Sequence, residues 1–275
     1  MNILPIIVLY KCQLENSECI NTLLRLDNVS HLKEIFVYNN SPSIISIPDQ
    51  YMGINVHKIN DHENSGVSKA YNEGLKFAKK MNYEYVLLLD QDTSLPGDAL
   101  VIYKESLRAN KYIKLFCPIL KKNTGVICSP LLYRLHRGFP VNHFKAGKYE
   151  FDDFTPINSG MLLNVDAALE CGGYNEEVFL DFSDFQFIER FKKHNPCFYV
   201  VPLILYQDCS GDEVDPSKLL IRFRLYCQCA KKCVREKIQD DFIYFLMVFA
   251  RAVKMAVKTK RIDFIINFYK YYIRG

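Results

Sequence analysis

The first two-thirds of the chain alternate between short apolar runs and segments with helical spacing. Residues 3–9 and 85–89 are continuous apolar runs of strand length, which is typical of strands buried on both faces of a sheet. Between them, apolar residues recur every three or four positions over residues 67–81, as on a helix with one buried face. This alternation predicts an α/β fold with a mostly parallel sheet flanked by helices.

Further elements follow from the same patterns. Strands are expected at residues 34–38, 54–59, 113–118, 125–129, 160–165 and 198–206. Helices are expected at residues 19–26, after Pro96 and Gly97, and at residues 184–194. Residues 133–154 are polar, so we expect a long loop there, of the kind that often serves as a functional lid.

The character of the chain changes beyond residue 215, where Lys and Arg interleave with Leu, Ile, Phe and Tyr. We therefore expect an α/β domain at residues 1–210 and a basic amphipathic helical region at residues 211–275. Arg251 and Lys254 interrupt the most apolar part of this region, so it suits a membrane span poorly. Its helices either lie on a membrane surface, which we favour, or pack on the first domain with their charges exposed.

Composition places the chain among globular proteins. Its 275 residues are 49% hydrophobic and 24% charged, which excludes a disordered chain and suits one large domain or a domain with an appendage. The net charge of +4 is a mild excess, so no nucleic acid partner is expected.

The ten cysteines predict reduced thiols. No two of them have the C-x-x-C spacing that favours zinc, and most lie within apolar runs. The apolar segment at residues 3–9 is too short for a signal peptide, and no basic region precedes it. We therefore expect a cytoplasmic protein.

Two acidic residues, Asp90 and Asp92, directly follow the most apolar strand, with Gln91 between them. Ligands of open α/β sheets bind outside the carboxyl ends of the strands. A divalent cation can compensate the charge of two carboxylates there, because Mg²⁺ and Mn²⁺ prefer oxygen ligands that they share with substrate phosphates. The alternative is a solvated turn, since Asp is common in turns.

A second cluster stands at the start of the helix that precedes this strand. It contains Asn64, Gly66 and Ser68, and a helix N-terminus beside a glycine presents free N–H groups to an anion. Asn72 has helical spacing to Ser68, so both are expected on the same side of the helix. The alternative is an ordinary capped helix in which Gly74 is a packing residue.

A third cluster combines Asn158, Ser159 and Gly160 with two acids further along the chain, Asp181 and Asp184. Asp184 stands just where a helix is expected to begin. It is therefore either an N-cap or a general base that removes the proton of an acceptor hydroxyl. The residues alone leave both interpretations open.

The order of these clusters resembles the family 2 glycosyltransferases of the GT-A fold, in particular their rhamnosyltransferase-like branch. That branch shows an N-x-G-x-x-x-A-x-N-x-G helix start, then L-L-D-Q-D, then N-S-G, then an acidic F-x-D-x-x-D segment that leads to an Arg. This chain has these motifs at residues 64–74, 88–92, 158–160 and 179–190. Each motif is modest alone, but the ordered set is specific and covers about residues 1–210.

The resemblance implies an inverting single displacement on a nucleotide-diphosphate sugar. It implies that Asp90 and Asp92 bind Mn²⁺ or Mg²⁺ and that Asp184 is the general base. The implied donor-binding residues are Tyr10, Asn39, Asn64, Gly66, Ser68, Asn72, Asp90 and Gln91. The implied acceptor-side residues are Asn158, Ser159, Gly160 and Asp181.

Three positions depart from the pattern of the family. The turn after the second strand begins with Asn39 where Asp is usual, so it brings hydrogen bonds but no charge to a base. Gln186 stands where a further acid is frequent. Near the last strand, Gln207 and Asp208 stand where many relatives have a His, and the sequence leaves open which of them completes the metal site.

Together these features predict an enzyme that transfers a sugar from a UDP- or dTDP-sugar to a lipid-linked or saccharide acceptor in bacterial surface polysaccharide synthesis. We expect it at the inner face of the cell membrane, held there by the C-terminal helices, as a monomer or a homo-oligomer. Two other classes stay open. One is a nucleotidyltransferase, although the turn at residues 10–12 lacks the Gly-rich loop usual in that class. The other is a non-catalytic nucleotide-sugar-binding protein of the same fold.

Overall fold

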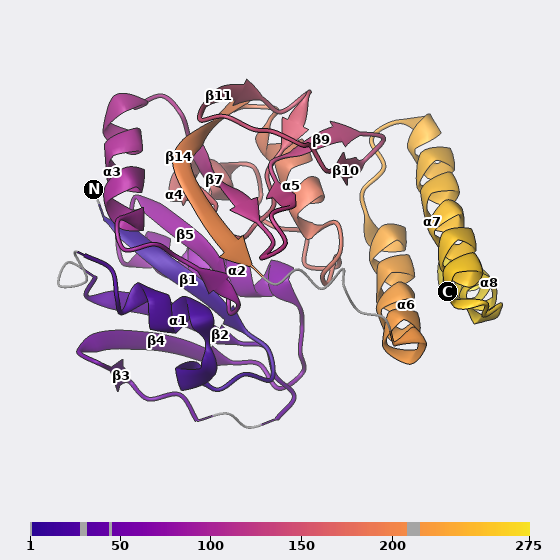
Figure 1. Ribbon diagram of the computed structural model, residues 1–275, viewed down its shortest axis with the longest axis horizontal. Coiled ribbons are helices and arrows are strands. Elements are labelled where there is room, and N and C mark those ends of the chain that lie inside the picture. The colour runs from indigo at the N-terminus through magenta and orange to yellow at the C-terminus, as the bar shows by residue number, and fades with distance from the viewer. Residues whose placement is uncertain (1, 28–31, 44–45, 208–214) are drawn as a thin grey trace.

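The two continuous apolar runs form adjacent strands at the centre of a large sheet. The computed structural model describes residues 2–27, 32–43, 46–207 and 215–275 (Figure 1). Within these residues the main sheet has 11 strands and a second sheet has three. Helices pack on both faces of the main sheet, which confirms the α/β fold class.

The elements agree with most of the expected ones to within a few residues. The main sheet consists of β1 (Ile3–Leu9), β2 (Glu34–Asn39), β3 (Gln50–Tyr51), β4 (Ile54–Asn60), β5 (Tyr85–Asp90), β6 (Thr93–Ser94), β7 (Leu115–Lys121), β8 (Ile127–Ser129), β11 (Gly147–Glu150), β13 (Leu162–Asn164) and β14 (Cys197–Gln207). The small sheet consists of β9 (Leu131–Arg134), β10 (Arg137–Phe139) and β12 (Phe154–Thr155). The helices are α1 (Glu18–Leu23), α2 (Val67–Lys80), α3 (Ala99–Ala109), α4 (Val165–Glu170), α5 (Ser183–Phe191), α6 (Pro216–Lys232), α7 (Ile238–Thr259) and α8 (Asp263–Phe268), with short helical turns at η1 (Leu14–Asn16) and η4 (Tyr269–Arg274).

Strands β5, β1, β2 and β4 lie side by side in that order and run parallel. The chain passes from β1 through α1 to β2 on one side, and from β4 through α2 to β5 on the other side of β1. The strand order therefore reverses between β1 and β5, and ligands of such sheets bind outside the carboxyl ends of the strands at this reversal. The register pairs Val8 with Asp90, which brings the end of β1 next to the Asp90 turn.

The other half of the sheet is mixed. β13 runs antiparallel to both β5 and β7, and β14 runs parallel to β7. At its far end β14 also pairs with β6, where Gln207 lies opposite Thr93. Because Thr93 directly follows Asp92, this pairing brings the end of β14 to the same edge of the sheet.

Alternate residues of the central strands point into two separate apolar cores. Ile7 and Leu89 belong to the core that α1 and α3 cover, whereas Ile6 and Leu88 belong to the core beneath α2, α4 and α5. All four side chains are fully buried. Such burial contributes about 1.5–3 kcal/mol for each side chain. The runs are continuously apolar because both faces of the sheet are covered.

The prediction of a long loop at residues 133–154 is wrong, because this segment contains strands. β9 and β10 form an antiparallel pair, β12 joins β9, and β11 extends the edge of the main sheet beside β14. Each of these strands has four residues or fewer, and most of their side chains are at least partly exposed. Strands this short and this open show no apolar period in the sequence.

The C-terminal helices α6, α7 and α8 gather at one end of the molecule (Figure 1, orange to yellow). Phe223, Tyr244 and Phe264 pack into a core of their own, which also contains Val178 and Phe182 from the segment before α5. The C-terminal region is therefore helical over the residues that the structure describes, and it packs against the segment that leads to Asp184.

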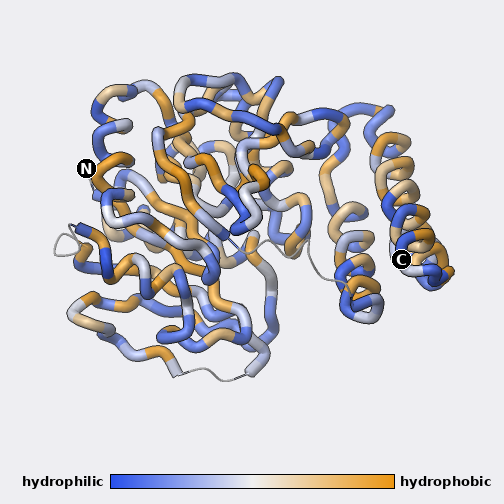
Figure 2. Tube along the Cα trace, in the orientation of Figure 1, coloured by the Kyte–Doolittle hydropathy of each residue, from blue (hydrophilic) through white to orange (hydrophobic). Residues whose placement is uncertain are grey.

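One side of α7 is apolar and exposed, and Figure 2 shows hydrophobic residues recurring along this helix. The exposed large apolar residues of α7, which we call the α7 stripe, are Ile238, Phe242, Phe245, Leu246, Phe249, Val253 and Val257. They recur mainly at three- and four-residue intervals, so they follow one face of the helix. None of the described helices combines the length and the hydropathy needed to cross a membrane.

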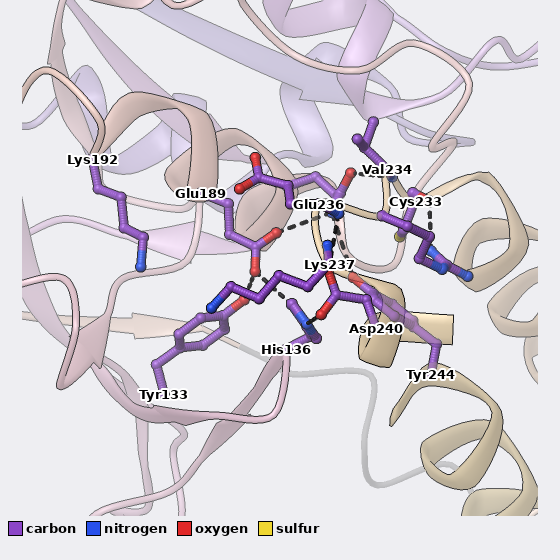
Figure 3. Close-up of polar contacts among 12 residues, drawn as sticks. Tyr133, His136, Glu189, Lys192, Cys233, Val234, Glu236, Lys237, Asp240 and Tyr244 are labelled. Carbon is purple, nitrogen blue, oxygen red and sulfur yellow. Dashed lines mark hydrogen bonds and ion pairs between the residues drawn. The ribbon is translucent and has the colours of Figure 1, made fainter. Parts of the chain in front are cut away.

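His136, in the turn between β9 and β10, ties α5 to α7 (Figure 3). Its Nδ1 lies 2.6 Å from Glu189 Oε1 on α5, and its Nε2 lies 3.0 Å from Asp240 Oδ1 on α7. The Tyr133 hydroxyl also donates to Glu189 Oε1, at 2.6 Å. The hydrogen bond to Glu189 outweighs the effect of burial and raises the pKa of His136. The imidazole of His136 lies between two carboxylates and thus links the helix that carries Asp184 to the C-terminal region.

Candidate active site

A cavity of about 530 Å³ opens at the carboxyl ends of β1 and β5. Five residues that the sequence predicts at the site line it, namely Tyr10, Asn64, Asp90, Gln91 and Asp92. The other polar residues that line it are Asn40, Gln207 and Arg222, and the apolar ones are Val8, Val67, Ile157, Phe179, Leu180 and Leu225. A concave pocket with apolar walls and a few convergent polar groups is typical of a ligand site.

The carboxylates of Asp90 and Asp92 face a common point. Gln207 Nε2 donates to Asp90 Oδ2 and to Asp92 Oδ1, and both distances are 2.9 Å. The Tyr71 hydroxyl donates to Asp90 Oδ1 at 3.1 Å. Burial raises the pKa of Asp90, and the hydrogen bonds from Gln207 and Tyr71 oppose this rise.

This pair of carboxylates fits a hard divalent cation. Two carboxylate oxygens that converge on one polar atom are the donor set that Mg²⁺ and Mn²⁺ take from proteins, together with waters or phosphates. Over the described residues, no group of three or more His, Cys, Asp or Glu residues gathers in a way that could hold a metal. Within the described residues, any further protein ligand would therefore be of another residue type. Asp208 lies outside the described residues.

The Asp-Gln-Asp turn is held by the neighbouring start of α1. The backbone oxygen of Gln91 accepts from Ser17 Oγ at 2.9 Å and from the N–H of Cys19 at 3.1 Å. The side chain of Gln91 accepts from the N–H of Tyr10 at 2.7 Å. The turn is thus fastened to both β1 and α1, which fixes the backbone from which Asp90 and Asp92 project.

Two residues that line the cavity, Asn64 and Gln207, carry a buried oxygen without a hydrogen-bond partner in the described part of the chain. Among the described residues, five buried side-chain atoms lack a hydrogen-bond partner, and four of them are oxygens of Asn39, Asn64, Asp181 and Gln207. Asn39 itself does not line the cavity, and its Nδ2 donates to Asn60 Oδ1 at 3.0 Å. Buried acceptors without partners are uncommon in native proteins, so these oxygens indicate a place for a ligand that carries hydrogen-bond donors or positive charge.

The start of α2 serves mainly to hold the pocket in place. A Cβ at Gly66, whose φ is +100°, would overlap the carbonyl oxygen of Phe179. Ser68 Oγ donates to the carbonyl oxygen of Val178 at 2.6 Å. Asn72 donates to the carbonyl oxygen of Tyr174 at 3.0 Å and accepts from its N–H at 2.8 Å. Gly66, Ser68 and Asn72 therefore fasten α2 to residues 174–179 and do not line the cavity themselves.

Asp184 lies in the first turn of α5 and does not act as its N-cap, because Phe182 occupies that position. Its Oδ1 accepts from the N–H of Phe185 at 2.9 Å. Burial, reinforced by the charges of Asp181 and Asp90, raises the pKa of Asp184 to about 7. Asp184 does not line the cavity, and its role as a general base stays a prediction.

Arg222 is a residue of the site that sequence reasoning missed. It projects from α6, lines the cavity, and its Nη2 lies 3.0 Å from Asp181 Oδ1. Several basic residues share α6, and no spacing rule singles out Arg222 among them. Only the packing of α6 against the α/β domain reveals which of these cations reaches the site.

The Asn158-Ser159-Gly160 motif is joined to its surroundings by hydrogen bonds within the protein. Asn158 donates to Ser183 Oγ at 3.2 Å and accepts from the Tyr174 hydroxyl at 2.8 Å. Ser159 Oγ lies 2.5 Å from Thr93 Oγ1. The motif therefore braces α5 and the turn after Asp92, and its role toward an acceptor stays a prediction.

Comparison with known proteins identifies the family. The sequence model described as glycosyl transferase family 2 matches residues 6–166, which is more than half of the chain. The chain belongs to glycosyl transferase family 2. The dTDP-rhamnosyl transferase RfbF of Shigella flexneri is 24% identical over 216 residues, which cover 77% of this chain and 70% of that protein. The resemblance found in the sequence motifs is thereby confirmed, and the protein is a glycosyltransferase.

Solved structures of two other proteins share the fold. TarS residues 1–349 of S. aureus, solved in complex with UDP-GlcNAc, matches with a TM-score of 0.54 at 17% identity, over 90% of this chain and 72% of that chain. GalNAc-T7, solved with UDP, GalNAc and Mn²⁺, also matches with a TM-score of 0.54, at 9% identity, over 100% of this chain and 57% of that chain. These matches support the GT-A fold, and family membership makes the substrate class a nucleotide sugar.

Proposed function

We propose that this glycosyltransferase moves a sugar from a UDP- or dTDP-sugar to a hydroxyl group of a lipid-linked or saccharide acceptor in bacterial surface polysaccharide synthesis, with inversion at the anomeric carbon. The observation that carries the proposal is the convergence of Asp90 and Asp92 on one point in a cavity at the β1–β5 reversal. Sheet reversals of this kind commonly bind nucleotides. The dTDP-linked donor named for the Shigella flexneri relative supports the donor class.

The nucleoside would bind where buried oxygens lack partners. Asn64, which lines the cavity, has one such oxygen, and Asn39 has another that lies outside the cavity lining. Uracil and thymine carry an N–H donor and the sugar hydroxyls of the nucleoside are further donors, so a bound nucleoside would supply the missing hydrogen bonds. Gly66 and Ser68 would act on the donor indirectly, because they hold the start of α2 beside this pocket.

Asp90 and Asp92 would hold Mn²⁺ or Mg²⁺ against the diphosphate of the donor. The bound cation would supply charge stabilisation for the departing diphosphate. The hydrogen bond from Tyr71 orients the Asp90 carboxylate for this role. Arg222 is the only basic residue among the described residues that line the cavity, so it would add a second positive group near the leaving group.

Asp184 would act as the general base. A carboxyl group with a pKa of about 7 is partly ionised at neutral pH and basic enough to accept a proton. In the reaction, the proton of the acceptor hydroxyl passes to the Asp184 carboxylate while the hydroxyl oxygen forms a bond to the anomeric carbon. The bond between that carbon and the diphosphate oxygen breaks, and the nucleoside diphosphate leaves with the electron pair. Asn158, Ser159, Gly160 and Asp181 would frame the acceptor side.

The donor is tested by thermal-shift and calorimetric titrations with UDP, dTDP and their sugars, with and without Mn²⁺. A true donor raises the melting temperature because it binds only the native chain, and Mn²⁺ should strengthen its binding. Asp92→Asn should lose the effect of Mn²⁺. Asp98→Asn, the same change at an exposed position six residues along the chain, should keep it. If none of these nucleotides stabilises the native chain with or without Mn²⁺, the proposed function is wrong.

The α7 stripe would rest on the inner face of the cell membrane and bring the site to a lipid-linked acceptor. The stripe is exposed and apolar, and Lys254 and Lys258 on the same helix are exposed as well, which suits a surface that contains anionic lipids. The full chain should co-sediment with vesicles that contain phosphatidylglycerol, and Phe242→Ser together with Val257→Ser should abolish this. If light scattering shows a stable dimer and this dimer does not bind the vesicles, the membrane role is contradicted. The stripe would then be the contact surface with a second copy of the chain.

A further inference from the structure

A single side-chain nitrogen lies between the carboxylates of Asp90 and Asp92. Gln207 Nε2 donates to one oxygen of each carboxylate at 2.9 Å, which uses both hydrogens of the amide. The other end of the same amide is different, because Gln207 Oε1 is buried and has no hydrogen-bond partner within the described residues. A buried acceptor without a partner needs an explanation. Either a bound ligand donates to this oxygen, or the amide group has a second orientation in which the oxygen is paired.

The position of Gln207 allows such a second orientation. Gln207 is the last residue of β14, and its pairing with Thr93 on β6 fixes its backbone. The torsion that carries a terminal amide is broad and roughly two-fold, so a half-turn is accessible. The half-turn exchanges Nε2 and Oε1 with little change of shape, and it would turn Oε1 toward Asp90 and Asp92.

The charge between the two carboxylates decides which orientation is stable. Without a cation, the amide hydrogens are attracted to Asp90 and Asp92, and a carbonyl oxygen in their place would be repelled. With a divalent cation the preference reverses, because amide carbonyl oxygens are ligands of such ions and amide hydrogens are repelled by them. The oxygen that lacks a partner without the cation would gain one when the cation is bound.

We propose that Gln207 bridges Asp90 and Asp92 in the absence of a cation and, after a half-turn of its amide, becomes the third protein ligand of Mn²⁺ or Mg²⁺. The proposal rests on the proposed function, since it requires a cation at Asp90 and Asp92. It accounts for a site in which the described residues provide no third His, Cys, Asp or Glu ligand. It also means that a cation must displace two hydrogen bonds in order to bind.

The first test measures Mn²⁺ binding to the full chain by the electron paramagnetic resonance of free Mn²⁺, with and without UDP or dTDP. Gln207→Met keeps the size of the side chain but removes the ligand, and it should weaken Mn²⁺ binding at least about tenfold. Gln207→Glu supplies a third carboxylate and should bind Mn²⁺ at least as tightly as the native chain. Gln50→Met is the matched control at an exposed position and should leave binding unchanged.

The second test follows the side-chain amide of Gln207 by nuclear magnetic resonance, with its signal identified by its loss in Gln207→Met. Addition of Mg²⁺ should shift this signal in the native chain, since its hydrogens leave the two carboxylates, and should not do so in Asp92→Asn. If Gln207→Met binds Mn²⁺ as tightly as the native chain or more tightly, Gln207 is not a ligand and only this inference fails. If the native chain binds neither Mn²⁺ nor nucleotide, the proposed function fails with it.

Discussion

Replacement of Asp184 by Asn should stabilise the protein at alkaline pH while it removes the activity. Burial, together with the charges of Asp181 and Asp90, raises the pKa of the Asp184 carboxyl from 3.8 to about 7 in the folded chain. Because the folded-state pKa is raised, the stability that the protonated Asp184 contributes is fully present below pH 3.8. This contribution is lost as the pH rises to about 7, because the carboxyl group ionises first in the unfolded chain. The loss is about 1.4 kcal/mol per pH unit.

The Asn variant lacks this ionisation, so its free energy of unfolding should gain about 3 kcal/mol relative to the native chain between pH 5 and pH 8. Urea titrations followed by circular dichroism at both pH values measure the difference. Asp98→Asn, an exposed control, should show almost no such gain. Release of nucleoside diphosphate should fall at least about 100-fold in Asp184→Asn, while donor affinity stays unchanged. A pH-independent stability difference would refute the shifted pKa, and full activity would refute the base assignment.

Two further predictions concern the contacts of the C-terminal helices. The raised pKa of His136 means that its contribution to stability is present below about pH 6.5 and is lost as the pH rises through the higher folded-state pKa. The difference in the free energy of unfolding between the native chain and His136→Gln should therefore shrink from pH 6 to pH 9 in urea titrations. The titration of Asp184 cancels from this comparison because both chains contain it. A difference that stays constant would contradict the ion pairs with Glu189 and Asp240. Arg222→Met should weaken nucleoside diphosphate binding about tenfold or more, since hydrogen bonds to charged groups contribute about 1.5–3 kcal/mol. Calorimetry measures this affinity. Equal affinity in both chains would show that Arg222 does not bind the donor.

The fold could be predicted where burial leaves a strong pattern. β1 and β5 could be predicted because their apolar residues alternate between two covered cores. β9, β10 and β11 are not, because strands this short with exposed side chains carry no period, and their pairing depends on partners elsewhere in the chain. Their misinterpretation as a loop also hid His136, whose partners Glu189 and Asp240 lie far along the sequence.

The site could be predicted where it is local to a strand end. Asp90 and Asp92 lie together because they follow one strand, and the sheet reversal brings Tyr10 beside them. Gln207 meets Asp92 only because β14 pairs with β6, a contact between residues 115 positions apart. A single sequence carries no trace of such a pairing, so it could only raise Gln207 and Asp208 as alternatives.

The C-terminal helices share a core with the segment that leads to Asp184, so they are part of the same packed structure and not a separate attachment. Val178 and Phe182, which precede α5, are buried in the same core as the residues of α6 and α7. Arg222 reaches from α6 into the cavity and pairs with Asp181. Because Asp184 lies in the first turn of α5, which His136 ties to α7, the position of the proposed base depends on packing by the C-terminal helices. A surface that binds the membrane through the α7 stripe would therefore be joined directly to the helix that carries the proposed base.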